Sequence, residues 1–113
     1  MSADAAREPR FSVTAAPEAG DVIGLAVSGE VDIATAPGLR TALADAIGRS
    51  PRGIELDLRD CSFIDSTGLQ AIVRAAVALG ERGGWLSLSR PPERLRRLFE
   101  TAGIDRIDGI RLP

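Results

Sequence analysis

The nine residues Cys61-Ser-Phe-Ile-Asp-Ser-Thr-Gly-Leu69 decide the fold, because they connect a predicted strand at 54–58 to the most regular helix of the chain. Within them, Asp65 and Ser66 have side chains that readily accept hydrogen bonds from the free N–H groups of a helix's first turn. The apolar residues that follow recur at three-and-four spacing, which predicts a helix running to about Arg82. Its expected buried face is Leu69, Ile72, Val73, Ala76 and Val77. We therefore expect Ser66 at a helix N-terminus on the surface, where the helix dipole favours negative charge such as a phosphate.

The composition is that of a small soluble protein. With 113 residues, the chain has enough length for one domain with a single core. No apolar run approaches the ~20 residues that a membrane helix needs, and the first ten residues lack the apolar segment of a signal peptide. A single cysteine fits a reducing compartment, and a net charge of −2 gives no electrostatic footprint for nucleic acid. We predict a cytoplasmic protein without membrane or nucleic-acid partners.

Two residue types are absent from the sequence. There is no histidine, which removes the commonest general base and a leading ligand of transition metals. All fourteen basic residues are arginine, so a Walker A loop and lysine Schiff-base chemistry are excluded as well. A Ser-His-Asp or Cys-His site cannot be built from this chain alone. We predict that the protein is not an enzyme and has no cofactor and no metal.

The rest of the chain alternates short strands with helices. Strands are expected at 11–15, 23–27, 54–58, 86–88 and 107–112, a turn at 17–21, and helices at 36–48, 66–82 and 92–103. The order is β-β-α-β-α-β-α-β, and strand–helix–strand connections produce parallel neighbours, so the sheet should be mixed. Because the strands alternate apolar and polar residues, we expect helices mainly on one face of the sheet. This predicts a two-layer α/β domain over 11–113, preceded by a flexible segment, 1–10.

Two motifs carry a family resemblance: Gly29-Glu-Val-Asp32 after the second strand, and Leu56-Asp-Leu-Arg-Asp-Cys-Ser-Phe-Ile-Asp-Ser-Thr-Gly-Leu69. They resemble the STAS domain family and, more narrowly, the bacterial anti-sigma factor antagonists. The likeness in element order runs from about Phe11 to Leu112 and includes Arg97-Leu-Phe-Glu-Thr-Ala-Gly103. The resemblance implies a STAS-like domain.

The resemblance also implies a partner-switching role. In that class, the serine after the motif aspartate is phosphorylated by an anti-sigma factor that is also a serine kinase. The unphosphorylated form binds this kinase and frees the sigma factor, and a metal-dependent serine phosphatase restores that form. The motif match places the serine at Ser66 and a partner-contacting acid at Asp32. The predicted partner-binding residues are Asp32, Asp65, Ser66, Thr67 and Gly68, of which the last two are small enough for close approach.

Other interpretations stay open beside this role. Asp65 and Ser66 can be only a helix cap, and Asp32 only a turn cap. The chain can also be a STAS module of a stress-signalling scaffold or a lipid-transport complex, without a reversible serine switch. An enzyme that uses Asp65 or Asp60 through an aspartyl phosphate is disfavoured, because the receiver-type site for that chemistry includes a lysine.

Several further residues have plain structural interpretations. Cys61 is expected to be a small packing residue. Trp85 either covers the polar face of the sheet or belongs to an interface. The arginines of the last helix, Arg94, Arg96 and Arg97, are expected to form a solvated face. Antagonists of this type often continue into another amphipathic helix, whereas the sequence stops at Pro113. Either that helix is dispensable here or its place on the sheet is partly open.

Overall fold

A five-stranded sheet forms the centre of the protein in the computed structural model, which describes residues 10–113. The strands are β1 (Ser12–Ala19), β2 (Val22–Val31), β3 (Gly53–Ile64), β4 (Trp85–Ser89) and β5 (Ile110–Arg111). The helices are α2 (Ala36–Gly48), α3 (Ser66–Gly80) and α4 (Glu93–Thr101), followed by the 3-10 turn η1 (Ile104–Arg106). The predicted element order is confirmed. The predicted flexible segment, 1–10, lies outside the described residues except for Arg10.

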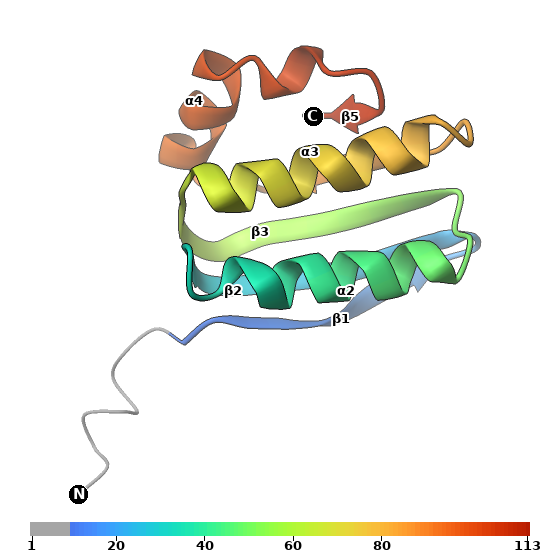
Figure 1. The fold of residues 1–113 in the computed structure, drawn as a ribbon, viewed down its shortest axis with the longest axis horizontal. Helices are drawn as coiled ribbons and strands as arrows, with labels where there is room; N and C mark the ends of the chain where they lie inside the picture. The colour runs from blue at the N-terminus through green and yellow to red at the C-terminus, as the bar shows by residue number, and fades with distance from the viewer. Residues whose placement is uncertain (1–9) are drawn as a thin grey trace, which may run out of the picture.

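The sheet is mixed and keeps its strands in sequence order, β1-β2-β3-β4-β5. β1 runs antiparallel to β2, while β2, β3, β4 and β5 are parallel neighbours. α2 and α3 lie side by side across one face, and α4 lies at the end of the sheet away from β1 (Figure 1). This arrangement confirms the predicted two-layer α/β fold with helices mainly on one face. Within residues 10–113, no helix is long and apolar enough to cross a membrane.

The core lies between the sheet and the helices. Ile54, Leu56 and Leu58 of β3 point toward the helices and are fully buried. On the opposite face, Glu55 is exposed and Asp57 is half-buried. The alternation predicted for this strand is therefore confirmed, because side chains on a strand point to opposite faces in turn.

Trp85 covers part of the polar face of the sheet. It is the register partner of Gly53 in β3, and a Cβ on Gly53 would come within 2.4 Å of the indole ring. The Arg111 guanidinium lies over the Trp85 ring, 4.2 Å from its centroid, close enough for a cation–π interaction. Of the two roles expected for Trp85, the structure supports the one in which its ring covers part of the polar face of the sheet.

Three strands, β1, β2 and β3, are clearly longer than their sequence patterns predict. β1 continues to Ala19, into the region predicted as a turn, which is confirmed only at Gly20 and Asp21. The register of β1 is irregular between Ala16 and Ala19. Since β1 is an edge strand, the missing N–H of Pro17 is tolerated at this irregularity. β3 reaches Ile64 rather than ending near 58, because its second half stays paired with β2.

The buried face of α3 differs in part from the predicted one. Ile72 and Ala76 are buried as expected, but Val77 is 44% exposed, while Ala71 and Ala75 are buried. α3 packs against α2 as well as against the sheet, so its buried stripe is displaced toward the neighbouring helix. A pattern that assumes one contact surface misses this shift.

Candidate functional site

Ser66 is the first residue of α3, and its hydroxyl is exposed. The preceding residue, Asp65, is the N-cap: its Oδ1 accepts hydrogen bonds from the backbone N–H of Thr67 at 2.9 Å and of Gly68 at 3.1 Å. Within residues 10–113, the Ser66 hydroxyl makes no hydrogen bond. The cap role proposed for the pair therefore belongs to Asp65, which leaves the Ser66 oxygen free. The prediction that Ser66 lies at an exposed helix N-terminus is confirmed.

The Asp65 carboxylate is held in its ionised form. A hydrogen bond from the Thr67 hydroxyl to Oδ1 is the main cause that lowers the pKa of Asp65. Desolvation opposes it, and the backbone N–H groups of Gly68 and Thr67 lower the pKa further. The other oxygen, Oδ2, is not involved in the cap. The group thus keeps its negative charge at neutral pH beside the helix N-terminus, where the helix dipole stabilises it.

Asp32 closes the turn after β2. Its Oδ1 accepts hydrogen bonds from the backbone N–H of Ala34 at 2.9 Å and of Thr35 at 3.1 Å. The Thr35 hydroxyl donates to the Glu30 carbonyl at 2.8 Å and accepts from the Asp32 N–H at 2.8 Å. The predicted turn-capping role of Asp32 is confirmed, and its contact with a partner stays a prediction.

Parallel pairing brings the two motifs together. Val31 and Ile64, the last residues of β2 and β3, are register partners, and the Asp65 N–H donates to the Val31 carbonyl at 3.0 Å. Asp32 and Asp65 follow these partners directly, so both acids lie at the same edge of the sheet as Ser66. Residues more than thirty positions apart in sequence therefore form one surface.

Gly68 has a packing role in the structure, and its contact with a partner stays a prediction. It is buried, and a Cβ at this position would lie 2.7 Å from Ile64 Cγ2 and 2.7 Å from Val31 Cγ1. The glycine allows α3 to approach the ends of β2 and β3 closely. Thr67 is half-buried, with its hydroxyl bonded to Asp65.

Two apolar residues of this edge escaped the sequence analysis. Ile33 in the turn after Asp32 is 77% exposed, and Phe63 near the end of β3 is 43% exposed. The sequence does hold a signal for both: an isoleucine within a polar turn, and a phenylalanine next to Ile64, which faces the core. Phe63 lies in the part of β3 beyond the predicted end of the strand, where alternation with the buried Ile64 turns it outward, and Ile33 lies in a turn.

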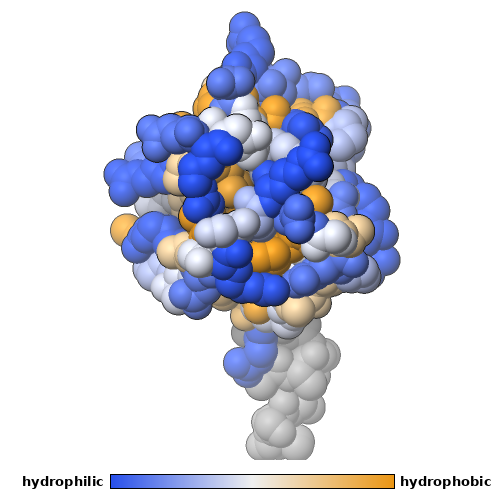
Figure 2. All heavy atoms as spheres, turned by 90° about the vertical axis from the view of Figure 1, so that its right-hand side faces the viewer, coloured by the Kyte–Doolittle hydropathy of each residue, from blue (hydrophilic) through white to orange (hydrophobic). Residues whose placement is uncertain are grey.

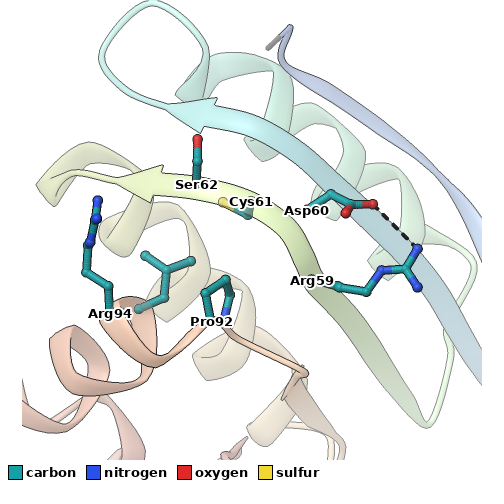
Figure 3. A pocket seen from close by; sticks show the side chains of 7 residues that line it. Arg59, Asp60, Cys61, Ser62, Pro92 and Arg94 are labelled. Carbon is teal, nitrogen blue, oxygen red and sulfur yellow. Dashed lines mark ion pairs between the residues drawn. The ribbon is translucent and has the colours of Figure 1, made fainter.

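A shallow cavity of about 340 Å³ lies beside this edge, between β3 and α4 (Figure 3). Its lining residues are Arg59, Asp60, Cys61, Ser62, Pro92, Arg94 and Leu95. The Cys61 thiol is buried, and desolvation raises its pKa, so it is a neutral packing group as predicted. Asp60 pairs with Arg59 at 3.6 Å on the exposed surface, which gives no enclosed site for an aspartyl phosphate. Within the described part of the chain, no three potential ligands are grouped to hold a metal ion.

The strand order, the single helix layer and the Asp-Ser-Thr-Gly turn opening α3 define a STAS-type domain. A family model described as "Mlab, STAS domain" matches residues 14–112, and the chain belongs to the STAS domain family. The anti-sigma-B factor antagonist of Listeria monocytogenes is 37% identical over 91 residues, which is 80% of each chain. That of Bacillus subtilis is 36% identical over 84 residues, 74% of this chain and 76% of the relative.

Solved structures agree with this family. An anti-sigma factor antagonist from Mycobacterium paratuberculosis is similar with a TM-score of 0.75 and 27% identity, covering 90% of this chain and 86% of the other. The antagonist SpoIIAA in its unphosphorylated form has a TM-score of 0.66 at 22% identity, covering 88% of this chain and 100% of the other. At that identity, the likeness to SpoIIAA concerns the fold alone.

Proposed function

We propose that this protein is an anti-sigma factor antagonist, switched by phosphorylation of Ser66. In its unphosphorylated form it binds an anti-sigma factor that is also a serine kinase. That kinase phosphorylates Ser66 and ends the binding, and a serine phosphatase reverses the modification. The chain is then the substrate of the kinase and not itself an enzyme. The observation that supports this most directly is the exposed Ser66 hydroxyl, left free because Asp65 alone caps α3.

The helix N-terminus can accept a phosphate without loss of the fold. A phosphoserine adds about −1.5 to −2 charge units. The first N–H groups of a helix and its dipole stabilise such an anion. Asp65 adds repulsion, but solvent screens charges on an exposed surface. We therefore expect α3 to remain folded in the phosphorylated protein.

The same phosphate opposes docking, because a partner that covers Ser66 removes the water around it. A buried charge without a counter-charge is expensive, and a kinase brings the phosphates of its own nucleotide to the acceptor serine. A loss of about 3 kcal/mol in binding free energy is roughly a hundredfold in affinity, which one unpaired dianion can supply. The switch is thus blocking of an interface and not refolding. Asp32, Asp65 and Thr67 would lie within the covered surface.

The direct experiment is phosphorylation in vitro. The chain is incubated with ATP and individually purified anti-sigma factor kinases, and the phosphate is mapped by mass spectrometry. We expect one site, Ser66. Phosphate on Thr67 or on another residue contradicts the assignment.

Binding of variants then tests the mechanism. Ser66→Ala should bind the kinase as well as the unmodified protein, while Ser66→Asp should bind much less well. Thr41→Asp, at an exposed position of α2, is the matched control for an added charge. Equal affinity of the two Ser66 variants would remove the electrostatic mechanism. Circular dichroism of both should match that of the unmodified protein.

The second candidate function is a STAS module of a stress-signalling scaffold or a lipid-transport complex, without a reversible switch. The description of the matching family model favours it, since it refers to Mlab and not to an antagonist. In that case no kinase labels Ser66, and Ser66→Asp assembles with its partners as the unmodified protein does.

A further inference from the structure

Two of the three large hydrophobic side chains exposed within residues 10–113 lie at the edge of the sheet that holds Ser66. They are Ile33 and Phe63, here called the apolar pair; the third, Val77, lies in the second half of α3. Single exposed hydrophobic residues need no explanation, but grouped ones indicate an interaction surface. The opposite end of the molecule, where β3 begins, is mostly hydrophilic, with hydrophobic residues visible only between polar ones (Figure 2).

Strand pairing determines where Phe63 points. Phe63 is the register partner of Glu30, and the next pair along the two strands, Val31 and Ile64, is buried. Since neighbouring side chains of a strand point to opposite faces, Glu30 and Phe63 project away from the core beside one another. An acidic and an aromatic side chain are thus presented together at the end of β2 and β3.

Ile33 is held in place by the turn around it. The Asp32 carboxylate bonds two backbone N–H groups of this turn, and the Thr35 hydroxyl ties it back to the Glu30 carbonyl at 2.8 Å. A turn that is already fixed needs little further backbone ordering when a partner covers it. The backbone that carries Ile33 is therefore arranged before a partner binds.

The charge beside the apolar pair is negative. Glu30 is exposed and forms no ion pair with another described residue. Asp32 uses Oδ1 for the turn, and Oδ2 is neither buried nor bonded within the described residues. A complementary surface needs an apolar hollow with arginine or lysine next to it.

We infer that Ile33 and Phe63 anchor the protein to its kinase by entering an apolar hollow whose basic neighbours pair with Glu30 and Asp32. This inference rests on the proposed function, and it adds the chemistry of the kinase surface to it. Asp32 and Ser66 lie at the same edge of the sheet, so contact there brings the kinase to the acceptor serine.

The test uses the kinase that phosphorylates Ser66 in the experiment above. Its affinity is measured by calorimetry for the unmodified chain and for Phe63→Ala, Ile33→Asn and Val77→Ala. We expect binding at least about tenfold weaker for the first two variants, as for buried anchors of an interface, and within about twofold for Val77→Ala. Thermal melting of each variant checks folding, and the 77% exposure of Ile33 makes its substitution the safer one for stability.

Salt dependence separates the charged from the apolar part. Binding of the unmodified chain should weaken with rising salt, Glu30→Gln should reduce that dependence, and Phe63→Ala should leave it unchanged. If Ser66 is phosphorylated but the folded variants of Ile33 and Phe63 bind like the unmodified chain, the inference is wrong while the proposed function stands. If no kinase labels Ser66, both are wrong. If binding does not depend on salt, the inference that basic groups of the kinase pair with Glu30 and Asp32 is wrong.

Discussion

Replacing Gly68 by alanine tests how the site is built, because the sign of the stability change depends on what Gly68 faces. In an exposed helical position, glycine to alanine stabilises a protein by about 0.4–1 kcal/mol. The structure instead places two methyl groups, Ile64 Cγ2 and Val31 Cγ1, 2.7 Å from the position of the added Cβ. Both neighbours are buried, at 3% and 0% exposure, so neither can move into solvent.

The expected magnitude follows from these contacts. Adding a methyl group to a filled core costs about 1–3 kcal/mol, and two simultaneous close contacts favour the upper half of this range. Subtracting the gain of about 1 kcal/mol for removing a helical glycine leaves a net destabilisation of about 1–2 kcal/mol. Relief of the contacts would move the start of α3 away from β2 and β3, so phosphorylation of Ser66 should also slow.

Urea unfolding followed by far-UV circular dichroism measures the difference. Gly48→Ala is the matched control, since it lies in the last turn of α2 with no atom within 4 Å of an added Cβ. The control should be as stable as the unmodified protein or slightly more stable. If Gly68→Ala is also as stable or more stable, the close packing of α3 on β2 and β3 is refuted.

Three further predictions follow from other contacts. The pKa of Asp65 is lower in the folded than in the unfolded protein, so its carboxylate stabilises the fold at any pH above the unfolded-state pKa. This stabilisation is lost as the pH falls through the folded-state pKa. The melting temperature should therefore fall below about pH 4, and less so in Asp65→Asn; equal slopes for both proteins would contradict this. Cys61 is buried with a raised pKa, so a thiol reagent should label it only on unfolding, and rapid labelling of the folded protein would place it at the surface. Gly53→Ala should displace the ring of Trp85 and shift the fluorescence spectrum, which reports on Trp85 because it is the only tryptophan of the chain. An unchanged spectrum would show that the two residues are not in contact.

The local features of the fold were predictable from the sequence. Proline in the first turn and the following apolar spacing predict the first helix, which begins at Ala36 and ends at Gly48 as expected. The alternation from Ile54 to Leu58 correctly predicts which face of β3 is buried. The exposed Ser66 at the start of α3 follows from the Asp-Ser-Thr-Gly motif, because helix capping depends on neighbours two and three residues away. Each of these depends on contacts within a few residues.

Features that depend on distant neighbours were decided by the tertiary structure. β3 extends to Ile64 only because β2 pairs with it, and the buried face of α3 shifts because α2 lies beside it. Gly68 faces the core because Val31, thirty-seven positions away, occupies the space in front of it. The sequence by itself thus determined the serine, its helix start and the alternation of the strands. Only the folded sheet brought Asp32 and Ile33 to the end of β3 that leads to this serine, because neighbouring parallel strands end at the same edge of a sheet.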